Sequence, residues 1–194
     1  MDMNHIDQRE SHYEKFLGTL TDQVMHSTDI KPVHVDVYTF PPTADRPYYT
    51  LITGGMFDLR QNIPPQHTSL GRRAEIMTYA HEPQGWMYNV LKGLAEMPFD
   101  DDTFLHWYHT VPNGKAMTAD PSDLTAFLFV PPYLEAKDFS PMTVDGDETD
   151  FLVMVPITDS ELNYTREHRV EAMLEVFDRH DFDYVVNEKR RSFV

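Results

Sequence analysis

The sequence contains no cysteine, and this absence removes several kinds of chemistry at once. Without thiols there can be no disulfide, no cysteine nucleophile and no cysteine-ligated zinc site. No run approaches the roughly 20 apolar residues that a membrane-spanning helix requires. The first seven residues carry neither a basic region nor an apolar stretch typical of export signals, so we expect a cytoplasmic protein without membrane contact.

Basic residues are scarce. The chain has 16 Lys and Arg against 32 Asp and Glu, which gives a formal net charge of −16. Such a surface repels nucleic-acid phosphates and anionic membranes and attracts basic partners, so we do not expect nucleic-acid binding. The same charge would also keep a protein soluble without any partner. The composition leaves both explanations open.

Phosphate-loop, nucleophile-elbow and dinucleotide-binding motifs are also missing, although the chain has a conspicuous glycine pair. Residues 47–53 are rich in aromatic and β-branched side chains, which favour a strand, and Gly54 and Gly55 follow directly. Paired glycines allow backbone angles and close approaches that a Cβ would block. We expect a strand that ends at a structural corner. Asp58 and Glu75 could form an acid–base pair nearby, but their spacing does not place them within reach of each other.

Hydrophobic periodicity predicts helices and strands mixed along the chain. The expected helices span 7–25, 83–98 and 158–179, and a capping box at Thr158 and Glu161 begins the last one. The expected strands span 33–38, 47–53, 73–80, 103–111, 125–130 and 151–155, with 184–186 as an edge strand. At 194 residues we expect one domain covering 1–194, of the α/β (α+β) class: a mixed, largely antiparallel sheet flanked by helices.

Several pieces of sequence occur in an order that resembles the Suppressor of Fused domain family. They are 48–59 (YYTLITGGMFDL), 73–77 (RAEIM), 91–95 (LKGLA) with 102–104 (DTF), 151–162 (FLVMVPITDSEL) and 191–194 (RSFV). The resemblance covers most of the chain from about Tyr48 onward. Two positions depart from the family pattern: members tend to have a small residue where Phe57 stands, and often a glycine where residues 167–169 lead into the last helix.

This resemblance implies a fold like the N-terminal lobe of the animal proteins, with no catalytic centre and no cofactor. In the animal proteins a second lobe, not found in this sequence, helps to clasp a peptide of a transcription factor. Bacterial single-domain members look like cytoplasmic immunity proteins that neutralise a cognate toxin. The resemblance therefore implies a non-enzymatic protein-binding domain whose partner is a protein, possibly a basic toxin domain. It leaves the oligomeric state open.

His106 and His109 suggest an alternative from another class, a metal-dependent hydrolase that uses these two histidines and nearby aspartates. The residues around them favour a strand, in which positions three apart point to opposite faces, so we expect no shared metal. The acidic stretch 145–150 lacks the glycine position and the bidentate glutamate of a calcium loop. We expect the partner to bind acidic groups on two exposed loops, namely Asp100, Asp101, Asp102, Asp145, Asp147, Glu148 and Asp150.

Overall fold

The computed structural model describes residues 4–21, 23–28, 31–67, 70–118 and 122–194. Its strands are β1 (Val24–Met25), β2 (Asp36–Phe40), β3 (Tyr49–Gly54), β4 (Arg73–Ala80), β5 (Thr110–Pro112), β6 (Leu124–Val130), β7 (Met142–Val144), β8 (Asp147–Thr158) and β9 (Val185–Val186). Its helices are α1 (His5–Leu17), α2 (Gly85–Asp100) and α3 (Asp159–Arg179), with the short 3-10 turns η1 (Met56–Asp58) and η2 (Pro65–His67).

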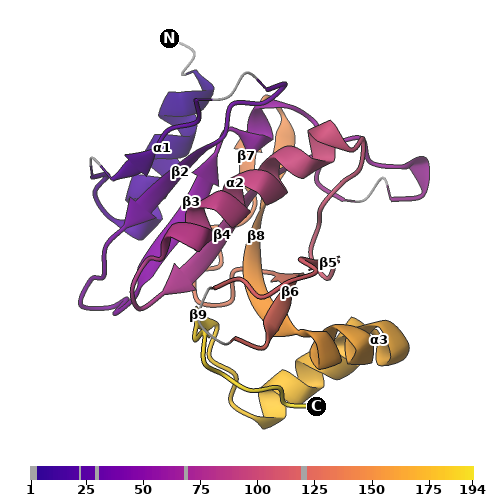
Figure 1. The fold of residues 1–194 in the computed structure, drawn as a ribbon. Helices are drawn as coiled ribbons and strands as arrows, with labels where there is room; N and C mark the ends of the chain where they lie inside the picture. Colours follow the sequence, from indigo (N-terminus) through magenta and orange to yellow (C-terminus); the bar gives the residue numbers. More distant parts are fainter. Residues whose placement is uncertain (1–3, 22, 29–30, 68–69, 119–121) are drawn as a thin grey trace.

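In the described residues all nine strands belong to one sheet (Figure 1). The main order is β1-β2-β3-β4-β8-β6-β5, with β7 paired to β8 and β9 paired to β4. Among the strand pairs that the structure describes, only β4–β8 and β4–β9 are parallel. The predicted fold class, a mixed and largely antiparallel sheet flanked by helices, is confirmed.

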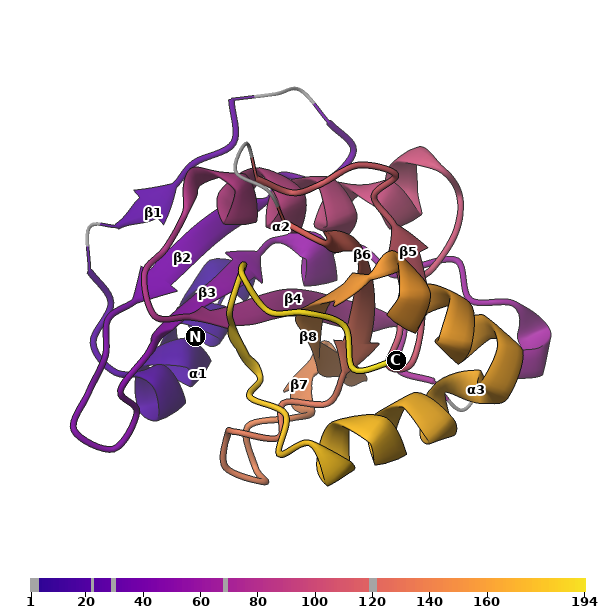
Figure 2. The same cartoon turned by 60° about the horizontal axis from the view of Figure 1, so that its bottom comes forward.

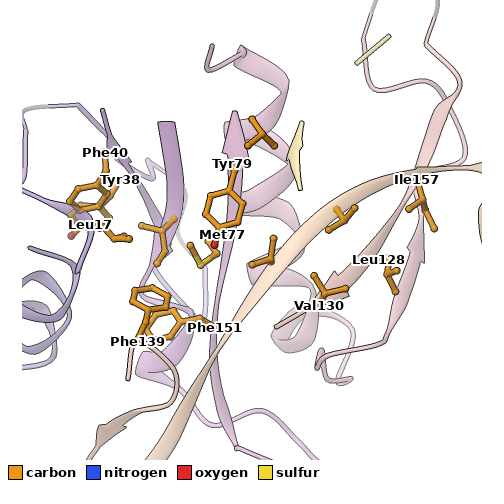
Figure 3. Packing of buried hydrophobic residues seen from close by; sticks show 14 of the residues in the cluster. Leu17, Tyr38, Phe40, Met77, Tyr79, Leu128, Val130, Phe139, Phe151 and Ile157 are labelled. Atoms are coloured by element: carbon orange, nitrogen blue, oxygen red, sulfur yellow. The ribbon is translucent and has the colours of Figure 1, made fainter. Parts of the chain in front are cut away.

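Helices cover both faces of the sheet (Figure 2). On one face α2 buries Met87, Leu91 and Leu94. On the other face α1 and α3 enclose a second cluster, part of which Figure 3 shows around Met77 and Phe151. Full burial of each large apolar side chain contributes about 1.5–3 kcal/mol, so the two clusters dominate the stability of the fold.

The central strand β4 carries the sheet. All eight of its residues are buried, as expected for a strand covered on both faces. One edge of β4 pairs with β3, and the other pairs first with β8, from Arg73 to Met77. Beyond that point β9 takes the place of β8, with Tyr79 opposite Val185. The predicted strand in the tail exists, but it pairs with the central strand and not at the outer edge of the sheet.

Several sequence-based boundaries are wrong: the strand expected over 33–38 spans 36–40, and the strand expected over 151–155 spans 147–158. The first helix ends at Leu17 and not near residue 25, because Gly18 adopts a φ of 104°. The second helix continues past Pro98 to Asp100. The expected strand over 103–111 is reduced to β5, since residues 103–109 form an irregular segment.

The last helix begins as predicted and then breaks. The Thr158 hydroxyl accepts from the backbone N–H of Glu161, and the Glu161 carboxylate accepts from the backbone N–H of Thr158. Arg169 interrupts the helix with a φ of 71° and a ψ of 165°, and Figure 2 shows the resulting sharp bend. The helix therefore consists of two segments, 159–168 and 170–179. Among the helices of the described residues, none is long and apolar enough to cross a membrane.

Candidate partner-binding surfaces

The glycine corner after β3 is a structural feature. Gly55 has a φ of 124°, and a Cβ there would lie 2.0 Å from the carbonyl oxygen of His34. The Glu75 carboxylate, from β4, accepts hydrogen bonds from the backbone N–H of Gly55 at 2.8 Å and of Phe57 at 3.2 Å. It also accepts from the Thr53 hydroxyl at 2.5 Å. The buried Glu75 carboxylate therefore stabilises a backbone conformation at position 55 that a residue with a Cβ could not adopt.

Glu75 and Asp58 do not form the acid–base pair that the sequence left open. Glu75 is fully buried, and this burial raises the pKa of Glu75 to about 7 against the opposing effects of Thr53 and Arg9. Asp58 instead interacts with His5 at 3.1 Å and with Arg9 at 3.6 Å, both on α1. The two carboxylates thus hold α1 and the glycine corner together, and neither has the arrangement of a general base facing a substrate.

Two of the predicted partner-binding carboxylates are neutralised within the chain. Asp147 lies 2.5 Å from Arg60 and 3.0 Å from Arg73, and the hydrogen bond from Arg60 lowers the pKa of Asp147. Asp145 lies 2.7 Å from His5 and 3.6 Å from Arg73. Because their charges are paired with their own cations, Asp145 and Asp147 offer little attraction to a basic partner.

Asp150 is not on an exposed loop, so this part of the prediction is wrong. Strand β8 begins at Asp147, and all of its residues from Thr149 onward are buried, so that only 5% of Asp150 is exposed. The carboxylate lies 3.1 Å from Nε2 of the buried His106. This pair attaches the irregular segment 103–109 to the sheet.

His106 and His109 are not on a strand, so the geometric reason for rejecting a shared metal does not hold. The backbone N–H of His109 donates to the His106 carbonyl oxygen at 3.2 Å, which closes a turn, and the His109 ring packs 4.9 Å from Phe104. Both histidines line an open cleft of about 550 Å³ that also reaches Glu148. Within the described parts of the chain, no group of three or more histidines and carboxylates could hold a metal ion.

The remaining predicted carboxylates are exposed, as expected. Asp100 pairs with Lys31 at 2.5 Å, and Asp102 accepts a hydrogen bond from the Asn62 amide at 2.9 Å. Asp101 and Glu148 have no ion pair among the described residues. Of the seven candidate residues, these last two are the ones whose charge is fully available to a partner.

An exposed aromatic surface was missed by the sequence reasoning. Tyr108, Tyr133 and Leu134 expose 43%, 49% and 40% of their surface. The Tyr133 ring lies 5.4 Å from that of the half-buried Tyr184. We call these four residues the tyrosine patch. One signal was available: Pro131 and Pro132 end a buried strand, so the tyrosine and leucine that follow must lie in a loop.

Comparisons with known proteins agree on the family and the fold. Residues 31–191 match the family model described as Suppressor of fused protein (SUFU). A SUFU homolog from Neisseria gonorrhoeae FA 1090 superposes with a TM-score of 0.76 at 20% sequence identity, covering 100% of this chain and 98% of the homolog. A chain of the Sufu–Fu complex superposes with a TM-score of 0.68 at 16% identity, covering 97% of this chain and 90% of that chain.

Drosophila Suppressor of Fused gives a TM-score of 0.68 at 15% identity, covering 97% of this chain but 50% of the Drosophila chain. This chain therefore spans about half of the Drosophila protein. A search of curated proteins found no match. The structural likenesses show the shared fold, and the family model extends over most of the sequence. The chain belongs to the Suppressor of fused family.

Proposed function

We propose that this chain is a non-enzymatic, cytoplasmic protein-binding domain that neutralises a cognate protein toxin. Its membership of the Suppressor of fused family carries this proposal. A relative of the same fold has been crystallised as the Sufu–Fu complex, a complex of two proteins. The Neisseria homolog is matched over 98% of its length, which supports a working unit of a single domain spanning 1–194.

The charge of the chain supports a basic partner. A net charge of −16 speeds the encounter with a cationic protein and disfavours anionic competitors. Such steering acts mainly on the association rate and on specificity, while packed contacts set the final affinity. The proposal therefore requires a docking surface besides the overall charge.

Neutralisation can be measured by expressing a toxin with and without this chain in the same bacterial cells. The toxin to test is the product of the reading frame beside the gene for this chain. We expect this product to stop growth alone, and we expect growth to return when this chain is expressed with it. The Neisseria homolog is the matched control. It shares the fold but is only 20% identical to this chain, so it should not protect against this chain's own toxin.

Continued growth arrest in the presence of well-expressed chain, with no complex on gel filtration, would overturn the proposal.

Metal analysis of the purified chain separates this function from that of a metal-dependent hydrolase. Stoichiometric zinc or manganese that disappears in His106→Ala would favour the hydrolase instead. Both readouts use the intact chain.

A further inference from the structure

The tyrosine patch lies where three segments meet. These are the connection after β6, the segment that leads from α3 into β9, and the turn before β5. Figure 2 shows the first two running beside each other at the bottom of the view. The ring of Tyr133, in the first segment, lies 5.4 Å from that of Tyr184, in the second. Burial, and next the neighbouring Tyr108, raise the pKa of Tyr133. Large aromatic side chains exposed together on a folded surface are typical of protein–protein contact sites.

Tyr108 is held in place by an unusual backbone. Its φ is 70°, a conformation that bulky residues rarely adopt. Its N–H nevertheless donates to the carbonyl oxygen of Phe129 at 2.6 Å, next to the bond from the Phe129 N–H to His109. The sheet thus fixes the main chain at a position where the side chain remains 43% exposed. Strained backbone that the surroundings maintain is concentrated at functional sites.

A row of carboxylates lies on the second segment of α3, whose end leads into the patch. Glu171, Glu175 and Asp178 recur at helical spacing along the second segment of α3, so they share one exposed face. No cation of the described residues lies within 4.0 Å of these carboxylates. Asp178 lies at the turn that leads from α3 to the patch: its carbonyl oxygen accepts from the Asp181 N–H at 3.3 Å, and the ring of the next residue, Phe182, lies 5.1 Å from that of Tyr184. Burial, and next the Asp178 charge, raise the pKa of Tyr184 to about 12. These carboxylates differ from Asp145 and Asp147, whose charges are already paired.

The aromatic side chains that continue from Tyr184 into the fold already contact one guanidinium of their own chain. Arg190 lies 5.3 Å from the ring centre of Phe182 and 5.5 Å from that of Phe193. Phe182 in turn contacts Tyr184 at 5.1 Å. The tyrosine end of this aromatic group has exposed rings and a nearby unpaired carboxylate. Arginine suits such a site better than lysine, because its planar group stacks on a ring while its N–H groups donate to a carboxylate.

We propose that the tyrosine patch, with Asp178 at its border, binds an arginine-bearing segment of the partner protein. The inference rests on the proposed protein-binding function and adds to it the surface and the chemistry of the ligand. It moves the binding site away from most of the carboxylates that the sequence suggested, because the structure pairs or buries them.

Titration with a short peptide tests the surface without knowledge of the partner. The probe is a five-residue peptide of alternating glycine and arginine with blocked ends, added to the ¹⁵N-labelled chain and followed by NMR. We expect the largest shift changes at residues 133, 134, 178 and 184, and weaker binding of a peptide with lysine in place of arginine. Tyr133→Ala and Asp178→Asn should each raise the Kd about two- to five-fold.

Two control variants make the test specific. Leu59→Ala removes another exposed apolar residue, and Asp101→Asn removes one negative charge elsewhere. Neither should change the Kd, and the spectra show directly that each variant is folded. Shift changes centred on another surface, or an equal loss of binding in Asp101→Asn and Asp178→Asn, would overturn the proposal. Because toxin neutralisation is measured separately, such a result would remove the surface and leave the proposed function standing.

Discussion

At Gly55 the main chain passes so close to the preceding loop that only hydrogen fits on the α-carbon. We predict that Gly55→Val destabilises the fold by about 1–3 kcal/mol from its φ of 124° alone, with a further loss from the contact with the His34 carbonyl. Urea unfolding of the purified variant measures the loss. The glycine corner would be a binding site and not a structural one if the variant unfolded like wild type but lost its partner.

Gly93 provides the matched control for this substitution. It lies on the exposed side of α2, and a Cβ there would meet nothing within 4 Å. Gly93→Ala should therefore keep or increase stability, by up to about 1 kcal/mol, because alanine favours helix more than glycine does. Opposite signs at the two glycines would separate the backbone requirement from a general effect of glycine replacement.

The buried Glu75 should make stability depend on pH. Its pKa is about 7 in the folded chain and about 4.5 when unfolded, so between these values the folded state binds a proton that the unfolded state does not. The free energy of unfolding should therefore fall as the pH rises through this window, by about 3 kcal/mol in total. Below pH 4.5 and above pH 7 this residue should contribute no slope.

Glu75→Gln isolates that contribution, because an amide can still accept from Gly55 and Phe57 without titrating. Urea unfolding at pH 5, 6, 7 and 8 should show a steeper decline for wild type than for this variant. Glu171→Gln, which removes an exposed carboxylate, should follow the wild-type profile. Parallel profiles for wild type and Glu75→Gln would show that Glu75 is ionised throughout this range.

At the scale of the elements, α3 contains a strained break at position 169, and a different residue there would relieve the strain. Arg169 has a φ of 71° and a ψ of 165°, a combination that is almost restricted to glycine. We predict that Arg169→Gly stabilises the fold by about 1 kcal/mol, because the relieved strain exceeds the added freedom of the unfolded chain. Arg166→Gly, three residues earlier and inside the first helical segment, should instead cost about 1 kcal/mol. Thermal unfolding of both variants gives the comparison, and a loss at both positions would contradict the strain.

The sequence predicted those elements whose signal is local. The alternation in β4, the apolar runs of β6 and β8 and the capping box at Thr158 can be recognised from the sequence, because neighbouring residues determine them. The segment 103–109 was mispredicted because its aromatic residues favour a strand, while a distant side chain overrides them. The Gln61 side chain forms two hydrogen bonds with the backbone of Leu105. Its amide N–H donates to the Leu105 carbonyl oxygen at 3.2 Å, and its amide oxygen accepts from the Leu105 N–H at 2.7 Å. No local pattern reveals such a contact.

The candidate site was predictable only in part, for a related reason. The sequence correctly indicated exposed carboxylates such as Asp101 and Glu148, which have no ion pair in the described residues, although Glu148 lies on strand β8 and not on a loop. It could not show that Arg60 and Arg73 reach Asp147 from distant positions in the chain. Ion pairing across the fold determines which charges remain available, and spacing along the sequence does not encode it.

For the whole molecule, the excess negative charge should make salt stabilising. A net charge of −16 opposes compaction, and added ions screen this repulsion. We predict that the Tm rises between 10 and 200 mM NaCl. Replacing the exposed Asp101, Glu148 and Asp181 with their amides should raise the Tm at low salt and reduce its salt dependence. A Tm that fell with salt would mean that ion pairs such as Arg60–Asp147 outweigh the repulsion.

The order of strands around β4 also determines how long an unpaired strand edge stays exposed while the protein is synthesised. One edge of β4 can pair with β3 at once. The other edge stays unpaired until β8 places Thr149 opposite Arg73 and β9 places Val185 opposite Tyr79. At about 5–20 residues per second, the ribosome leaves that edge open for about 4–15 s before β8 emerges. An open edge on a strand that is entirely buried in the finished fold is a template for pairing with another chain. Crowded polysomes and fast translation initiation should therefore lower the soluble yield, even though the finished sheet leaves no such edge on β4.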